Sequence, residues 1–434
     1  MKGYGEKMAD QITNYKCPAC AGPLHFAATS GMMECEYCDS KFTVEEIEAK
    51  YAEANKAAEE AKKSADSGAS DGIWSVTDEY MESDGMKTYE CPQCGASLVC
   101  DDNFAASSCP YCGNPTVVPG QFSDMLKPDF VLPFKLEKSA ALEALKKHYG
   151  KRYLLPAAFK DNSHLEEIKG VYVPFWLYDG DSSGDAVYEA IKEDRKKNGQ
   201  EEIITKKYYH VERKGTLVFN KIPADASSKM DDNMMDSIEP YDYKDLKPFT
   251  KAYLTGFMAD RYDVSAEDDS KRAVDRAKQS TKEALRKSVE GYTQVNTKKE
   301  NIVVNEGKAY YAMMPVWMLT TIWNGNKYTF AMNGQTGKMV GDLPVNKSKL
   351  WITLIIILAA VLGLGLGVIH WNTVGTIIAS IVIALIAYAV MMRGMTSVIK
   401  ASQANAYIDA SKTKITHKVD RFVREEKETR KISS

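Results

Sequence analysis

Eight of the nine cysteines in this 434-residue chain follow one pattern that occurs twice. In each copy, two Cys-x-x-Cys pairs are separated by 14 residues. The first copy consists of Cys17, Cys20, Cys35 and Cys38, and the second of Cys91, Cys94, Cys109 and Cys112. A Cys-x-x-Cys turn presents two thiolates to one metal ion, and two such turns complete a closed tetrahedral site. The spacing therefore predicts two zinc ribbons, each with one bound Zn²⁺.

The two sites are expected to be structural. All four ligand positions are cysteines, so no open position remains at which the metal could activate a water molecule. Cys100 lies between the two pairs of the second copy. We interpret it as a small buried residue, with a metal or redox role as the alternative. Reduced thiols that bind metal are typical of the cytoplasm.

No other set of residues predicts catalysis. The six histidines are scattered without paired spacing, and there is no HExxH motif. Residues 68–72 match GxSxG, but they follow a charged helix rather than a strand, so a nucleophile elbow is not expected. The stretch 333–338, NGQTGK, lacks the spacing of a phosphate-binding loop and predicts a hairpin turn. We therefore predict that the chain is not an enzyme.

Charge argues against nucleic acid as a ligand of the ribbons. Residues 16–43 carry a net charge of −1 and residues 87–118 a net charge of −2, before the thiolates are counted. Phosphate binding depends on clustered Lys and Arg, which neither ribbon supplies. Contact with another protein is the favoured interpretation.

The elements that must position these cysteines follow in a simple order. The predicted units are zinc ribbon one (14–43), a helical spacer and linker (44–86), zinc ribbon two (87–118), an α+β domain (120–346), a transmembrane helical hairpin (350–392) and a basic tail (393–434). Thr43 and Glu46 form a capping-box pattern that predicts the start of the spacer helix.

The α+β domain is expected to contain antiparallel strands and two helices. Helices are predicted from Ser139 to Gly150 and from Ser265 onwards. β-prone runs cover 130–134, 170–178, 206–213, 215–219, 302–304, 310–323 and 327–333. A Pro-x-Trp sequence occurs at Pro174 and again at Pro315, which indicates a duplicated β unit with each proline at an edge or bulge. Trp176 and Trp317 are expected in the core, and a ligand cleft between them is the alternative.

Residues 350–392 contain no Lys, Arg, Asp or Glu. Two apolar runs, 350–369 and 374–392, are each long enough to cross a membrane as a helix. Glycines at 363, 365 and 367 would let the two helices approach closely. The N-terminal segment is polar and predicts no signal peptide.

Flanking charge sets the expected orientation. Lys347 and Lys349 precede the first span, Arg393 and Lys400 follow the second, and the turn between the spans has no Lys or Arg. The positive-inside rule then places both ends in the cytoplasm. Residues 393–434 have ten Lys or Arg against five Asp or Glu. This tail is expected either as a solvated segment or as an amphipathic one that rests on anionic headgroups or docks a partner.

The combination resembles a bacterial family of membrane proteins with transcription-factor-IIB-type zinc ribbons. The matching features are the two ribbons, GVYVPFWLYD at 170–179, NGQTGK at 333–338, the apolar hairpin and the charged tail with DRFVREEKETRKI. The resemblance implies a location in the bacterial plasma membrane and a role beside SPFH-domain and phage-shock-type proteins in envelope stress.

Together these features predict a non-enzymatic adaptor with two structural Zn²⁺ ions, anchored in membrane lipid. It would recruit a soluble protein partner, of SPFH type by the resemblance, to the cytoplasmic face. The alternative is a membrane-tethered nucleic-acid-binding protein, and a ligand site in residues 120–346 is a third hypothesis.

Overall fold

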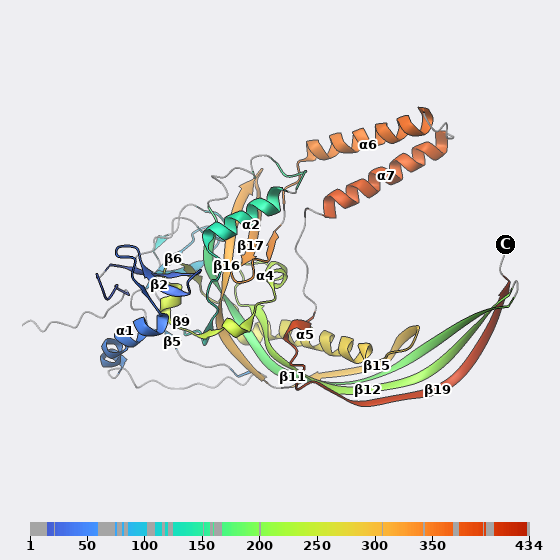
Figure 1. Cartoon of the computed structure of the whole chain (residues 1–434), viewed down its shortest axis with the longest axis horizontal. Coiled ribbons are helices and arrows are strands. Elements are labelled where there is room, and N and C mark those ends of the chain that lie inside the picture. Colours follow the sequence, from blue (N-terminus) through green and yellow to red (C-terminus); the bar gives the residue numbers. More distant parts are fainter. Residues whose placement is uncertain are drawn as a thin grey trace, which may run out of the picture.

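A computed structural model shows a small N-terminal sheet, a large central sheet with a long arm, and a pair of helices (Figure 1). It describes residues 15–20, 22–59, 74–75, 80–81, 86–101, 109–114, 118–119, 125–150, 152–156, 159, 167–198, 201–305, 307–341, 343–367, 373–393, 395 and 403–431. The GxSxG sequence at 68–72 and the end of the predicted spacer helix lie outside these residues.

The first cysteine module, residues 15–59, has its own sheet. Its elements are β1 (Leu24–Ala27), β2 (Met32–Cys35), β3 (Lys41–Phe42) and α1 (Val44–Glu59). The capping box is confirmed: the Thr43 N–H donates to the Glu46 carboxylate at 2.9 Å, and the Glu46 N–H donates to the Thr43 hydroxyl at 3.1 Å. Local hydrogen bonds therefore fix where α1 begins.

Two long antiparallel strands form the centre of the large sheet, and each has the same kind of neighbours. The strands are β11 (Lys169–Asn198) and β16 (Gly307–Trp323), flanked by β14 (Met258–Asp260), β10 (Phe130–Val131), β12 (Glu201–Asp225) and β17 (Asn326–Asn333). Val173 lies opposite Met314. On its outer side, β11 pairs first with β14, which runs parallel to it, and then with β12, which runs antiparallel. On its own outer side, β16 pairs in the same order with the parallel β10 and the antiparallel β17. This two-fold arrangement fits the predicted duplication of a β unit.

The two prolines of the repeated sequence lie in central strands and not at an edge or bulge as expected, and they occupy equivalent gaps between neighbouring strands. The Pro174 carbonyl accepts from the Ala226 N–H at 2.9 Å, and the Pro315 carbonyl accepts from the Gly334 N–H at 2.8 Å. In a strand the nitrogen and carbonyl of one residue point to the same side. The nitrogen of Pro174 therefore points to the gap between β14 and β12, and that of Pro315 to the gap between β10 and β17. Because no strand residue needs a hydrogen bond from these positions, the missing N–H groups do not break the hydrogen bonds between strands.

The second cysteine module, residues 86–119, belongs to this same sheet. Its strands are β6 (Met86–Glu90), β7 (Ser97–Asp101) and β8 (Val118–Pro119). Strand β7 pairs antiparallel with β14, which places Val99 opposite Ala259. The boundary expected between residues 118 and 120 therefore does not separate two sheets.

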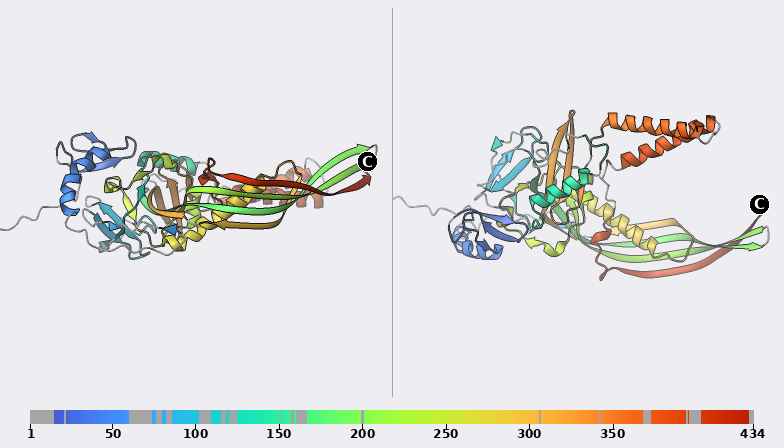
Figure 2. Two further views of the ribbon diagram at one scale, coloured as in Figure 1. Left: turned by 90° about the horizontal axis from the view of Figure 1, so that it is seen from below. Right: turned by 45° about the horizontal axis from the view of Figure 1, so that its top comes forward.

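Beyond Gly180, the hairpin of β11 and β12 continues as a long curved arm (Figures 1 and 2). The arm is widened by β15 (Gln294–Val304) beside β11 and by β19 (Lys414–Lys431) beside β12. Helix α5 (Ala266–Lys287) packs across its base, and its cap is as predicted, because the Ser265 hydroxyl accepts from the Asp268 N–H.

The tail is therefore corrected from a solvated or amphipathic segment to a strand. The whole of β19 pairs with the outer part of β12, from Thr216 opposite Lys414 to Glu201 opposite Lys431. β-branched and aromatic residues in this stretch suit a strand, and its many charges protect a sheet edge from further pairing.

The chain returns to the core before it enters β19. Ala404 donates its N–H to the Ser280 hydroxyl of α5 at 2.7 Å, and the Tyr407 hydroxyl donates to Glu239 at 2.7 Å. Arg276 pairs with Glu239 at 2.6 Å and also donates to the Gln403 carbonyl. All the charged groups of this contact are buried, so the returning segment is fixed to the core.

Two helices, α6 (Lys347–Gly367) and α7 (Thr373–Arg393), form a pair that projects from the core (Figure 1). Their apolar windows have mean hydropathies of 2.1 and 2.5, and both helices are long and apolar enough to cross a membrane. Of the glycines expected to allow a close approach, Gly365 does so, because a Cβ there would collide with the Thr376 methyl group, whereas a Cβ at Gly363 would meet no atom within 4 Å. The Leu343 N–H donates to the Met395 carbonyl at 3.1 Å, so both ends of the pair meet at one place on the core.

The remaining elements are short. They are β4 (Trp74–Ser75), β5 (Tyr80–Met81), β9 (Met125–Leu126), α2 (Lys138–Gly150), α4 (Asp232–Ile238), β13 (Lys247–Pro248), β18 (Met339–Gly341) and the 3₁₀ turns η2 (Tyr243–Asp245), η3 (Lys251–Leu254) and η4 (Asn405–Tyr407). The NGQTGK stretch forms the predicted hairpin turn, between β17 and β18.

Candidate metal centres

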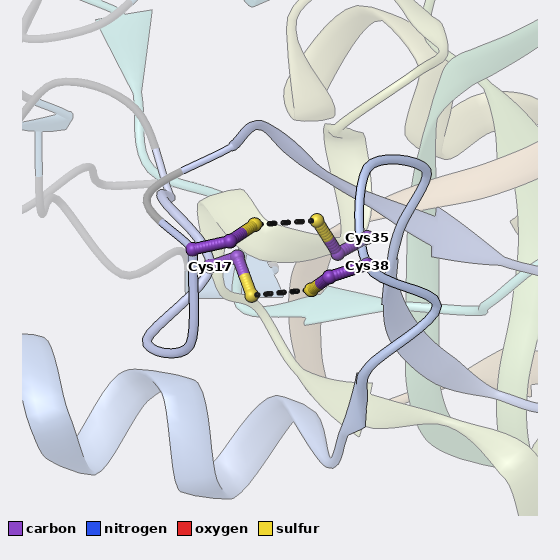
Figure 3. Close-up of side chains that lie close together, drawn as sticks. Cys17, Cys35 and Cys38 are labelled. Carbon is purple, nitrogen blue, oxygen red and sulfur yellow. Dashed lines mark hydrogen bonds between the residues drawn. The ribbon is translucent and has the colours of Figure 1, made fainter.

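Each predicted set of four cysteines is assembled in space. In the first module, the Cys17 and Cys38 sulfurs lie 3.5 Å apart, as do those of Cys20 and Cys35 (Figure 3). In the second, the Cys91–Cys112 and Cys94–Cys109 distances are 3.5 and 3.7 Å. Within each quartet, all four sulfurs lie within 4.8 Å of one another. The structure thus brings together all eight predicted ligands, in the predicted groups.

The spacing of the sulfurs fits a tetrahedral metal ion. A Zn–S bond of about 2.3 Å implies sulfur–sulfur edges of about 3.8 Å in a regular tetrahedron. A disulfide would need about 2.05 Å, which none of the measured pairs approaches. Two quartets of this size can therefore hold two metal ions per chain.

The backbone of all four Cys-x-x-Cys turns has one geometry. The first cysteine of each turn donates its N–H to the carbonyl five residues later, at 2.7 to 3.0 Å; these cysteines are Cys17, Cys35, Cys91 and Cys109. Asp39, Gly95 and Gly113 follow the second cysteine of three turns and have φ values of 55°, 69° and 74°. Glycine, asparagine and aspartate adopt this left-handed conformation most readily. The residue types after the cysteines therefore belong to the site as much as the cysteines do.

Hydrogen bonds to sulfur favour the thiolate form that a metal requires. The Ala19 and Gly22 N–H groups each lie 3.4 Å from a sulfur of the first quartet. The Ser40 hydroxyl lies 3.2 Å from the Cys38 sulfur, and hydrogen bonds with Ser40 are the largest cause that lowers the pKa of Cys38 to about 6. Without a metal ion, the Gly22 N–H acts to lower the pKa of Cys20, but the neighbouring thiols raise it to about 12. A divalent cation would allow all four cysteines to be thiolates, because it offsets their mutual repulsion.

The two quartets differ in their exposure to solvent. Cys20 and Cys38 of the first module are exposed, whereas Cys91, Cys109 and Cys112 of the second are buried. The tyrosine that precedes the last ligand shows the contrast most clearly: Tyr37 is 76% exposed and Tyr111 is 1% exposed. The same motif therefore presents one metal centre to solvent and encloses the other.

Contacts with the central sheet enclose the second quartet. The Thr320 hydroxyl of β16 donates to the Pro110 carbonyl at 2.8 Å. The Tyr111 side chain lies in the core close to Asp260, whose burial raises its pKa to about 6. Cys100 is buried on β7 in the same apolar cluster, which agrees with its interpretation as a core residue. The second module is part of the core of the molecule.

The first module docks on the domain through buried apolar side chains, which form one cluster with those of the domain core. The Phe26 ring packs edge-on against Tyr253 of η3, with centroids 5.2 Å apart. The Thr29 hydroxyl donates to the Glu137 carboxylate at 2.6 Å. The first module is therefore docked on the domain without sharing its sheet.

The other residues singled out in the sequence serve the core. The indole N–H groups of Trp176 and Trp317 donate to the carbonyls of Val264 and Leu136, both at 2.9 Å, and both rings are buried. The core interpretation thus accounts for both tryptophans. Within the residues that the structure describes, no third group of metal-ligating side chains of this kind is present.

One polar cluster of the arm was missed by sequence reasoning. His210 of β12 and His417 of β19 both contact the Glu212 carboxylate, at 3.0 and 3.2 Å. No spacing signal could have found it, because the two histidines are brought together only by the pairing of β12 with β19.

Comparison with known proteins finds a relative that matches most of the chain. The chain is 30% identical over 338 residues to the uncharacterized protein YdjG of Bacillus subtilis (strain 168). The match covers 78% of this chain and 92% of that protein. No protein-family model and no solved structure matches the chain.

Proposed function

This chain belongs to the same family as YdjG, and we propose that it is a membrane-anchored zinc-ribbon adaptor that recruits a soluble protein. The observation that carries the proposal is the exposed first quartet on a molecule that also has two apolar helices. An exposed, rigid knuckle offers a surface for a partner, and the helices offer attachment to a bilayer. The chain would act by binding and would not be an enzyme.

The metal in both quartets would be Zn²⁺. Four thiolates in a tetrahedron are the ligand set typical of structural zinc, and they leave no position for substrate or water. When bound, the ion would cross-link the two Cys-x-x-Cys turns of each module and so stabilise turns that bury few apolar side chains. Both quartets would then be zinc ribbons of the transcription-factor-IIB type, as the sequence resemblance implies.

The helix pair would span the plasma membrane as a hairpin. Most of the residues in its apolar windows face outward, where lipid would surround them. Because both ends of the pair meet on one domain, both would lie on the same side of the bilayer. Lys347, Lys349 and Arg393 flank the helices, which favours the cytoplasm for that side and hence for both termini.

The arm would remain outside the hydrocarbon. Its strands carry charges as far as their ends, for example Lys197, Glu201 and Glu428. The helix pair and the arm extend toward the same side of the core (Figures 1 and 2).

The surface around the second knuckle of ribbon one would bind the partner. Tyr37 and Glu36 are exposed there, Asp39 lies beside them, and the thiolates add further negative charge. An aromatic side chain in an acidic rim suits a partner that presents Lys or Arg. The family resemblance favours an SPFH-type partner and a role in envelope stress.

Substitutions at this knuckle test the proposal in the full-length protein. Tyr37→Ala with Glu36→Lys removes the surface without touching a ligand. Ile322→Ala with Glu290→Lys is the matched control, because it changes an exposed apolar residue and an exposed acid elsewhere. We expect the partner to co-purify from native membranes with wild type and control but not with the knuckle variant, while all three stay in the membrane fraction.

Several results would contradict the proposal. The same co-purified proteins with the knuckle variant would reject this surface, and recovery of wild type in the soluble fraction would reject the anchor. Salt-sensitive binding of DNA or RNA at physiological ionic strength would favour the membrane-tethered nucleic-acid binder. A zinc content far from two ions per chain would reject the metal assignment.

A further inference from the structure

Five positive side chains gather where the helix pair leaves the core. Lys146 and Lys147 lie near the C-terminal end of α2, Arg152 follows that helix, and Lys347 and Lys349 lie in the first turn of α6. We propose that this base surface, with Tyr153 and Trp351, binds the headgroups of anionic phospholipids. The inference rests on the proposed membrane anchor and deepens it by naming the lipid class and the face.

Direct contacts join the loop after α2 to the start of α6. The Asn346 N–H donates to the Leu154 carbonyl at 2.8 Å. The Tyr153 and Thr353 hydroxyls lie 3.4 Å apart, and the Lys349 ammonium lies 5.9 Å from the centre of the Tyr153 ring. Figure 1 shows the end of α2 beside the beginning of α6. Lys349 and the loop after α2 therefore share one surface, with the end of α2 next to that loop, at the point where a membrane span would begin.

The positive charge of this surface is not neutralised within the described chain. None of its five cations forms an ion pair with a described acid, and Glu143 is the one acidic residue described in 138–156. The Arg152 side chain also has a buried Nε atom without a hydrogen-bond partner among the described residues. An anionic ligand would satisfy the excess charge.

Two exposed aromatic rings give the surface the character of a membrane interface. Tyr153 and Trp351 are each 64% exposed. Tyr and Trp gather at the level of lipid headgroups, where the apolar ring meets the hydrocarbon edge and the polar end meets water. Lys side chains there can extend toward phosphate groups.

Continuity with the apolar helices selects a lipid surface as the occupant. Trp351 belongs to α6 itself, one turn before the fully apolar stretch, so phospholipid phosphates would lie at its level. The negative potential of a cytoplasmic leaflet attracts basic residues next to a span. Charge complementarity and position thus point to the same ligand.

Hydrogen–deuterium exchange of the full-length protein in nanodiscs tests the inference. The nanodiscs contain phosphatidylcholine alone or with phosphatidylglycerol. We expect amide exchange in 143–156 to slow about tenfold when the anionic lipid is present, because bound headgroups hold the end of α2 and the following loop. Lys146→Glu with Lys147→Glu should abolish this slowing. Lys196→Glu with Lys197→Glu, which makes the same charge change on the exposed arm, should preserve it.

Each possible outcome has a distinct meaning. Equal exchange in both lipid compositions, or loss of the effect in the arm variant as well, would overturn the inference while leaving the anchor intact. Slowing by inorganic phosphate in neutral nanodiscs would replace the lipid surface with a general anion site. Failure of wild type to enter nanodiscs would instead reject the proposed membrane anchor.

Discussion

The two cysteine modules share a ligand spacing but are integrated differently into the molecule. The second contributes three strands to the central sheet, and three of its four ligands, Cys91, Cys109 and Cys112, are buried. The first keeps a separate sheet and exposes Cys20, Cys38 and Tyr37. The motif therefore determines the local turn and the metal geometry, whereas the neighbours determine whether the module supports the fold or presents a surface.

The largest expected effect separates the modules by their contribution to stability. Cys109→Ser should destabilise the whole domain by several kcal/mol, because loss of the metal cross-link would expose part of the central sheet. Cys20→Ser should unfold residues 15–42 and leave the main thermal transition nearly unchanged. Differential scanning calorimetry with zinc analysis would measure both effects. Equal shifts of the main transition would contradict the contrast between the modules.

The next largest effect concerns β19, the C-terminal strand, which belongs to the large sheet as the second cysteine module does. Asp420 of β19 pairs with the buried Arg213 guanidinium of β12 at 2.5 Å, and this contact lowers the pKa of Asp420. Asp420→Ala would leave Arg213 without its carboxylate and should lower the unfolding free energy by about 2 kcal/mol. Denaturant unfolding would measure the change.

A matched substitution shows whether that loss is specific. Glu425 of the same strand is partly exposed and pairs with Lys207 at 3.6 Å. Glu425→Ala should lower the unfolding free energy much less than Asp420→Ala, because exposed ion pairs contribute little. Equal losses for the two variants would mean that β19 is only loosely attached.

A smaller effect tests how the first module is held. Tyr253→Ala removes the ring that packs against Phe26 and should loosen the first module by about 1 kcal/mol without loss of its metal. Limited proteolysis should then cut between the modules more rapidly, while the central sheet remains resistant. Tyr37→Ala, which alters an exposed ring, should leave the cleavage rate unchanged. Unchanged cleavage with Tyr253→Ala would mean that other contacts hold the module.

The features that could be predicted from the sequence are those that depend on residues close together in the chain. The quartets follow from Cys-x-x-Cys spacing, α1 and α5 begin at the capping residues Thr43 and Ser265, and the apolar helices follow from composition. The pairing of β19 with β12 could not be predicted, because some 200 residues and the helix pair separate the strands. The difference in exposure of the two quartets likewise depends on distant partners.

The last expected effect is a pH dependence, and it concerns a buried acid at the end of β12. Burial raises the pKa of Asp225 to about 7, although Arg272 lies 2.9 Å away. The folded state therefore binds a proton more tightly than the unfolded state, whose Asp has a pKa of about 3.9. Because proton binding is linked to folding, the free energy of unfolding should rise as the pH falls from 8 to 6. For this group the slope is at most about 1.4 kcal/mol per pH unit.

Asp225→Asn should reduce that dependence, because an amide is neutral at every pH in this range, while Asp260 and Asp269, whose pKa values burial raises to about 6, still contribute. Thermal unfolding of wild type and variant at pH 8 and pH 6 would measure the difference, and Asp263→Asn serves as control, because the pKa of Asp263 is lowered and lies below this window. The effect should persist when the first module is unfolded by Cys20→Ser, since Asp225 lies in the integrated part of the molecule. Its disappearance in that background would show that the first module is coupled to the core, so that exposure alone would not make a cysteine module independent.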